Sequence, residues 1–285
     1  MLNTSTIQTF IGFDAPLDKA QVVLFGAPFD GTTSFRPGTR FAPTSIRPDS
    51  YGLETYSPYL DLDLEDYALH DAGDIEVPFG NTVRTLNLIE ETAASILACN
   101  QKPLMVGGEH LVTLPVINAL VKKYSDLCIL HFDAHTDLRE DYLGEPLSHA
   151  CVLRRSWELV GDDRIYQFGI RSGLKSEFEW AKSHTHLQRF NTNGLKEILQ
   201  ALKGRPVYLT IDLDILDPSV FPGTGTPEPG GISMTELLDA LILMKNLPLV
   251  GADVVELSPH YDASGISTAA ACKVIREVAL LLACQ

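Results

Sequence analysis

Short apolar runs alternate with longer amphipathic stretches along almost the whole chain. The runs are rich in β-branched residues and nearly continuous in apolar character, which is typical of strands covered by helices on both faces. We expect strands at residues 21–27, 67–73, 103–108, 127–133, 164–170, 186–190, 206–214 and 249–257. Helical patterns lie between them, near residues 82–99, 111–124, 149–160, 174–183, 194–203, 233–245 and 264–283.

This alternation predicts a mostly parallel sheet with right-handed crossovers. Because the chain has no low-complexity linker, internal repeat or abrupt shift of composition, we expect one three-layer α/β/α domain over residues 1–285. A (β/α)8 barrel is the main alternative, since eight strands would also close a barrel. The stretches 31–45 and 217–231 are too long to be mere connectors, and such loops are often functional.

Composition and charge narrow the class of protein. The chain is 45% hydrophobic and 21% charged, which is ordinary for a globular protein. No segment has the roughly 18 consecutive apolar residues of a membrane helix, and the N-terminus lacks the pattern of a secretory signal. The net charge of −15 argues against nucleic acid and anionic membranes as partners and is compatible with a cationic substrate. The five cysteines form no short metal or redox pair, so we expect reduced thiols and a cytoplasmic protein.

The stretch "FDAHTD" places three metal-binding side chains two residues apart. In an extended segment, positions two apart share one face, so Asp133, His135 and Asp137 would project into one small volume. Two carboxylates and an imidazole crowded there would be costly without a cation between them. A solvated loop is the alternative interpretation.

Three other expected strands end in residues of the same kind. His110 follows two glycines in "GGEH", Asp212 and Asp214 lie two apart in "TIDLDILDP", and Glu256 ends "VVE". Taken alone, His110 could be a capping histidine, and the two aspartates could be turn residues before Pro218. Ligands gather at the carboxyl ends of strands in parallel sheets, however, so the combination predicts a metal site.

The donor atoms of these residues limit which metal ion the site could bind. They include no thiolate, which argues against a structural zinc site. Carboxylates with a few imidazoles suit Mn²⁺, although mixed sites also take Zn²⁺, Fe²⁺ or Co²⁺. Four carboxylates exceed what one divalent ion needs, so two ions about 3.5–4 Å apart fit the ligand number better.

The motifs "GGEH", "DAHTD", "DLDILDP" and "VVELSP" occur in the order and spacing of the ureohydrolases, the arginase and agmatinase family. The chain resembles this family over nearly its whole length and is most similar to the bacterial agmatinases, as in "DAHTDLREDYLGEPLSHA" and "FGIRSG". The resemblance implies an α/β/α fold with an eight-stranded parallel sheet, two Mn²⁺ ions per subunit, and a homo-oligomer, either a trimer or a hexamer.

The resemblance also implies roles for single residues. His110, Asp133, Asp137 and Asp212 would bind one ion, and Asp133, His135, Asp212 and Asp214 the other. His149 matches the family's proton-shuttling histidine, and Glu256 matches the acid that pairs with the substrate guanidinium. In the implied hydrolysis, a hydroxide shared by the ions attacks the guanidinium carbon, the leaving amine is protonated through Asp137, and urea departs. His149 could instead be a capping histidine, and Glu256 a solvated acid.

The loop "LREDYLGEPLS" indicates which guanidino compound is the substrate. It lacks the Ser, Thr and Asn pattern with which arginases hold an amino acid, and it offers Glu140, Asp141 and Glu145, which would tolerate an ammonium tail. We therefore expect a hydrolase of linear amidines that converts agmatine to putrescine and urea in polyamine biosynthesis. Another ureohydrolase (guanidinobutyrase, formiminoglutamase or arginase) is the alternative, and a non-catalytic polyamine-binding protein is a further one.

We expect two arginines and one further histidine to have structural roles. Arg40 and Arg47 would anchor loops through ion pairs, and His131 would lie in the core or behind the metal ligands.

Overall fold

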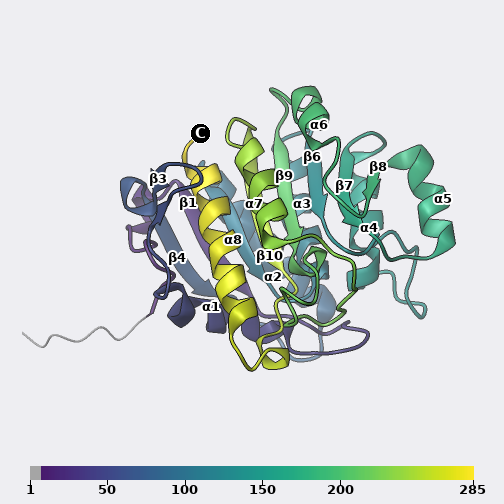
Figure 1. Ribbon diagram of the computed structural model, residues 1–285, viewed down its shortest axis with the longest axis horizontal. Helices are drawn as coiled ribbons and strands as arrows, with labels where there is room; N and C mark the ends of the chain where they lie inside the picture. The colour runs from purple at the N-terminus through teal and green to yellow at the C-terminus, as the bar shows by residue number, and fades with distance from the viewer. Residues whose placement is uncertain (1–7) are drawn as a thin grey trace, which may run out of the picture.

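An open eight-stranded parallel sheet forms the centre of the molecule (Figure 1). The structure is a computed structural model that describes residues 8–285, so the part of the single-domain prediction that falls on residues 1–7 lies outside it. Across the sheet, the strands are β4 (Leu69–Asp74), β1 (Val22–Ala27), β5 (Lys102–Gly107), β10 (Leu249–Val255), β9 (Val207–Asp212), β6 (Cys128–Phe132), β7 (Ile165–Ile170) and β8 (His186–Arg189). Strands β4 and β8 lie at opposite ends of this order and do not pair with each other, so the barrel alternative is wrong and the three-layer prediction is confirmed.

Helices cover both faces of the sheet (Figure 1). One layer contains α1 (Ala42–Ser50), α6 (Leu195–Ala201), α7 (Met234–Leu243) and α8 (Ile266–Ala283). The other contains α2 (Thr82–Ala98), α3 (Thr113–Val121) and α4 (Val152–Val160), and α5 (Lys175–His184) packs beside the edge strand β8. None of the helices within residues 8–285 has the length and apolar character needed to cross a bilayer.

Two elements differ from the sequence prediction. Helix α1 occupies the end of the stretch expected to be a loop at 31–45, and a small antiparallel hairpin joins β2 (Tyr56–Ser57) to β3 (Leu62–Asp63). Pro48 lies inside α1, where a proline removes a backbone donor and normally argues against a helix. The helix forms because its buried Ala42 and Ile46 join the core cluster that includes α8.

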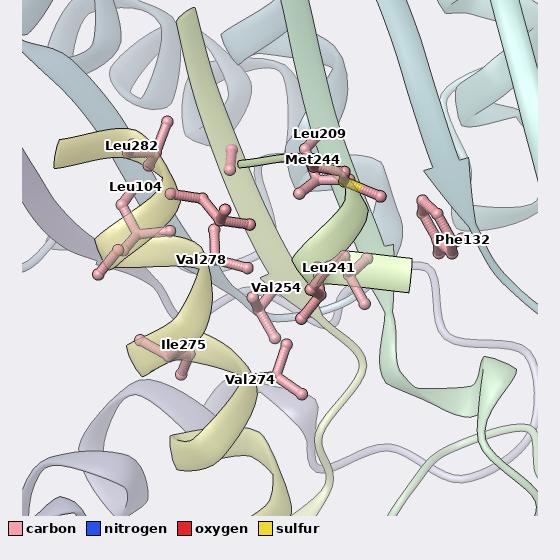
Figure 2. Packing of buried hydrophobic residues seen from close by; sticks show 14 of the residues in the cluster. Leu104, Phe132, Leu209, Leu241, Met244, Val254, Val274, Ile275, Val278 and Leu282 are labelled. Atoms are coloured by element: carbon pink, nitrogen blue, oxygen red, sulfur yellow. The ribbon is translucent and has the colours of Figure 1, made fainter. Parts of the chain in front are cut away.

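The side chains of the inner strands alternate between two hydrophobic cores, one on each face of the sheet. On β5, Leu104 and Val106 join the core under α7 and α8, whereas Met105 joins the core under α2 and α3. Figure 2 shows the first core, in which Val254 of β10 lies close to Val274 and Val278 of α8. Burial on both faces explains why the strands are nearly continuous in apolar character.

The predicted ion pairs of the two arginines are confirmed. The Arg47 guanidinium lies 2.8 Å from Asp71 and 2.7 Å from Asp74, which ties α1 to the edge strand β4. Arg40 pairs with the buried Asp30. All five cysteines are free thiols.

Sheet order brings the four motif-bearing strands together. Strands β5, β10, β9 and β6 are adjacent in the middle of the sheet and parallel, so their carboxyl ends meet at one edge. Each of these ends carries one of the motifs that the sequence singled out.

Candidate metal centre and active site

His110 and three aspartates converge at the carboxyl edge of the sheet. His110 opens the 3-10 turn after β5, and its ring Nδ1 lies 3.1 Å from Asp133 Oδ2, 3.2 Å from Asp137 Oδ2 and 3.4 Å from Asp212 Oδ2. All four residues are buried. His110 Nδ1 makes no hydrogen bond of good geometry, although three carboxylates face it. A buried ring nitrogen that faces three carboxylates at one point fits a cation at that point.

A second cluster shares Asp133 with the first. His135 Nδ1 lies 3.0 Å from Asp214 Oδ2 and 3.5 Å from Asp133 Oδ1, and these three residues are close enough to hold one ion. Among the contacts of residues 8–285, Asp212 is joined to His110 but not to His135. The structure therefore brings together the predicted first ligand set and three of the four residues predicted for the second.

The electrostatics of both clusters favour bound positive charge. Burial, together with the charge of Asp133, raises the pKa of Asp137 to about 7. Burial and neighbouring carboxylates also raise the pKa of Asp212 and of Glu256 well above the usual range. Burial alone would lower the pKa of His110 and His135, but the carboxylates around them raise it well above its usual value. A purely oxygen and nitrogen donor set with this much buried negative charge fits divalent cations such as Mn²⁺.

His131 lies behind Asp133, as expected, and its contacts argue against a ligand role. Its Nε2 is 2.7 Å from Asp133 Oδ2, and its Nδ1 is 3.1 Å from the side-chain nitrogen of Gln167. That Gln167 nitrogen also donates to the backbone carbonyl of Thr136, which fixes the amide orientation. The Nδ1 of His131 is therefore an acceptor and its Nε2 a donor, so neither ring nitrogen is free for a metal.

Two of the expected functional residues have left-handed backbone conformations. The φ of Asp137 is 52° and that of Glu256 is 67°, in a region that costs residues other than glycine about 1–2 kcal/mol. The Glu256 carboxylate is buried and accepts the backbone N–H of His110 at 2.7 Å. This contact ties the end of β10 to the turn that carries His110.

A cavity of about 270 Å³ lies beside these clusters. Its lining includes His135, Asp137, Asp212, Glu256 and His149. His149 comes from the loop that follows the aspartates, at the start of a 3-10 turn before α4, and its Nε2 lies 3.1 Å from the Ser34 hydroxyl. Burial, followed by the charges of His135 and His110, lowers the pKa of His149 to about 4.

Sequence reasoning missed the residues that support His149. The buried Glu109 carboxylate accepts hydrogen bonds from the backbone N–H and the hydroxyl of Thr32 and from the Thr33 hydroxyl. The Thr32 oxygen in turn accepts the backbone N–H of His149 at 3.1 Å. The adjacent Gly108 permits this approach, because a Cβ there would lie 1.9 Å from the carbonyl oxygen of Phe29. The consecutive hydroxyl residues in "GTTS" were the one available signal.

The acids expected beside the substrate tail are exposed. Glu140, Asp141 and Glu145 are not among the residues that line the cavity, so their contact with the tail stays a prediction. Tyr142 and Arg139 from the same loop line it instead, with the Arg139 guanidinium 4.5 Å from the centre of the Tyr142 ring. Two backbone hydrogen bonds between Tyr142 and Glu145 close a tight turn in this loop.

Comparisons with known proteins agree with this geometry. The family model that matches is described as the arginase family and spans residues 20–281. An agmatinase of Bacillus subtilis is 52% identical over 277 residues, which cover 96% of each chain. A guanidinobutyrase of Pseudomonas aeruginosa is 32% identical and covers 94% of this chain and 88% of its own. The crystal structure of agmatine ureohydrolase of Thermoplasma volcanium is 32% identical and has a TM-score of 0.88, covering 98% of this chain and 95% of that chain. The chain therefore belongs to the arginase family.

Proposed function

We propose that this protein hydrolyses agmatine to putrescine and urea, as a step of polyamine biosynthesis. The observation that carries the proposal is the 52% identity, over nearly the whole chain, to a protein named agmatinase. The unpaired His110 Nδ1 facing three carboxylates beside a cavity gives the hydrolysis a physical basis.

The proposed cofactor is a pair of Mn²⁺ ions. His110, Asp133, Asp137 and Asp212 would hold one, and Asp133, His135, Asp212 and Asp214 the other. When bound, such a pair lowers the pKa of a water molecule enough to supply hydroxide near neutral pH. That nucleophile is needed because resonance makes a guanidinium carbon a poor electrophile.

The other residues of the site would bind the substrate and move protons. The Glu256 carboxylate can form two hydrogen bonds with a planar guanidinium. The positive charge of that guanidinium would lower the pKa of Glu256 and so keep the carboxylate ionised. Asp137 would relay a proton to the leaving amine. His149 is neutral at physiological pH and can therefore accept a proton from solvent or substrate.

Steady-state assays of urea release from agmatine, arginine and 4-guanidinobutyrate test the substrate, with metal content measured on the same sample. We expect a clear preference for agmatine and no urea from an Asp133→Ala control. A preference for arginine or for 4-guanidinobutyrate would contradict the assignment.

A guanidino acid is the second candidate substrate, because Arg139 lines the cavity. A guanidinium at the wall attracts a carboxylate tail, and a relative that is 32% identical is named guanidinobutyrase. The buried Glu177 carboxylate lies 3.8 Å from Arg139 Nε and offsets part of this charge, which favours agmatine. The same three substrates distinguish the two functions.

A His149→Ala variant tests the role of the histidine. We expect turnover to fall by about 10²–10⁴-fold, the usual contribution of a positioned acid–base group, while manganese content stays that of the wild type. Loss of manganese from the variant would mean that His149 supports the metal centre instead of transferring protons.

The family resemblance supports three further proposals. These are a homo-oligomer (a trimer or a hexamer), a cytoplasmic location, and a single ureohydrolase domain over residues 1–285. Sedimentation velocity of the purified protein measures the first.

A further inference from the structure

Behind His110, a buried carboxylate takes no part in the chemistry described above. Asp253 on β10 contacts His110 only through the hydroxyl of Thr210 on β9. We propose that Asp253 and Thr210 are positioning residues that fix the tautomer of His110, so that its Nδ1 lone pair faces the three aspartates. This inference rests on the metal centre of the proposed function.

The donor and acceptor of each hydrogen bond to Asp253 follow from the negative charge of its carboxylate. The carboxylate lies 2.8 Å from the Thr113 hydroxyl, 2.5 Å from the Tyr208 hydroxyl and 2.6 Å from the Thr210 hydroxyl. An ionised carboxylate can only accept, so each of the three hydroxyls donates its single hydrogen to Asp253.

The Thr210 hydroxyl in turn determines which ring nitrogen of His110 carries the proton. Because its hydrogen is committed to Asp253, its oxygen can only accept from His110 Nε2, which lies 2.9 Å away. In the neutral form that binds a metal, the ring therefore carries its proton on Nε2 and its lone pair on Nδ1, the atom that converges with Asp133, Asp137 and Asp212. A metal needs this tautomer, and outer partners of metal-binding histidines often select it.

Packing alone does not account for polar residues at these two positions. Thr210 and Asp253 are direct neighbours in the parallel register of β9 and β10, and both are 0% exposed. Their neighbours on the same face of the strands, Tyr208 and Val255, belong to the hydrophobic core. An apolar pair would fill the space without the cost of burying a carboxylate, which its hydrogen bonds offset only in part.

Manganese titration of the metal-free protein by calorimetry tests the inference. Thr210→Val keeps the shape of the side chain and removes the hydroxyl, so we expect Mn²⁺ affinity to fall by about 10–100-fold. Thr210→Ser keeps the hydroxyl and should keep the wild-type affinity. Thr113→Val is the matched control, because it removes a hydroxyl from the same carboxylate without touching His110, and it should also bind Mn²⁺ as the wild type does.

Asp253→Asn gives a second, independent test. Two donors face Oδ2 and one faces Oδ1, so the amide would turn its oxygen to Tyr208 and Thr113 and its NH₂ to Thr210. The Thr210 hydrogen would then point at His110 Nε2 and move the ring proton to Nδ1, which blocks the metal-facing atom. We expect a loss of Mn²⁺ affinity at least as large as that of Thr210→Val, and this variant carries the test should Thr210→Val not fold.

The outcomes separate this inference from the proposed function. Wild-type affinity in Asp253→Asn or in folded Thr210→Val, or an equal loss in Thr113→Val, overturns the role of Asp253 and Thr210 while the metal centre stands. Wild-type protein that binds no Mn²⁺ overturns the metal centre itself.

Discussion

Among single residues, Glu109 connects two parts of the site that are far apart in the sequence. Its carboxylate fixes Thr32 and Thr33, and Thr32 in turn accepts the backbone N–H of His149. Ser34, two residues further on, contacts the His149 ring. The orientation of His149 in the cavity therefore depends on the segment at residues 32–34.

Replacing Thr32 tests this dependence. Thr32→Val removes the hydroxyl between Glu109 and His149 and should lower kcat about 10-fold, since a hydrogen bond of this kind contributes about 0.5–1.5 kcal/mol, or more when its partner is charged. Manganese content should not change. Thr32→Ser, which keeps the hydroxyl, should retain the wild-type kcat. Equal activity of the valine and serine variants would exclude a role for this hydrogen bond.

Some residues of the site could be predicted from the sequence, and others could not. The spacing of Asp133, His135 and Asp137 shows by itself that they share a face, so the structure brings them together as expected. Thr210 and Asp253 are different, because they lie inside apolar strands and not at the strand ends where the sequence indicated a metal site. Their contact exists only because β9 and β10 are neighbours in a particular register, and sequence patterns do not give that register.

Among the elements, helix α8 depends on a residue that precedes it. Asp262 accepts the backbone N–H groups of Ser264 at 3.0 Å and of Ser267 at 2.7 Å, so it satisfies an otherwise unpaired donor of the first helical turn. Burial alone would raise its pKa, but hydrogen bonds from Ser264 and Ser267 lower it to about 2.

Asp262→Ala should lower the free energy of unfolding by about 1 kcal/mol at neutral pH, as the loss of a helix cap does. Because the folded pKa lies below the usual value near 4, the contribution is complete above about pH 4 and is lost as the pH falls toward 2. Urea unfolding from pH 7 to pH 2 measures the difference, with Asp239→Ala on the exposed side of α7 as control. A difference that stays constant with pH would contradict the assignment.

Elements with a regular apolar pattern were predictable, and irregular ones were not. All eight strands of the sheet formed near their expected positions, although β9 ends earlier, where a 3-10 turn (Leu213–Ile215) follows it, and β10 ends before the left-handed Glu256. Helix α1 was not predicted from the sequence, because prolines are unfavourable inside helices and Pro43 and Pro48 interrupt its short apolar pattern. Tertiary contact with α8 stabilises it against that local preference.

For the molecule as a whole, bound metal should contribute to stability, since the residues proposed to bind it lie at or just after the ends of three different strands. Ligand at 100 times its Kd stabilises the folded state by about 2.7 kcal/mol, which corresponds to several degrees in Tm for a chain of this size. We therefore expect chelation to lower Tm and added Mn²⁺ to restore it. Asp133→Ala, which removes the carboxylate common to both clusters, should lose most of the Mn²⁺ response. An unchanged Tm on chelation would contradict metal binding at the carboxyl edge of the sheet.

The left-handed backbone at Asp137 and Glu256 has a consequence for evolution and engineering. The two residues together cost roughly 2–4 kcal/mol, a large part of the 5–15 kcal/mol that typically separates folded from unfolded chains. Glycine would relieve this strain and the crowding of negative charge at once. A screen that selects only for heat resistance would thus favour glycine at these two positions, at the expense of the metal ligand and the substrate-binding acid proposed above.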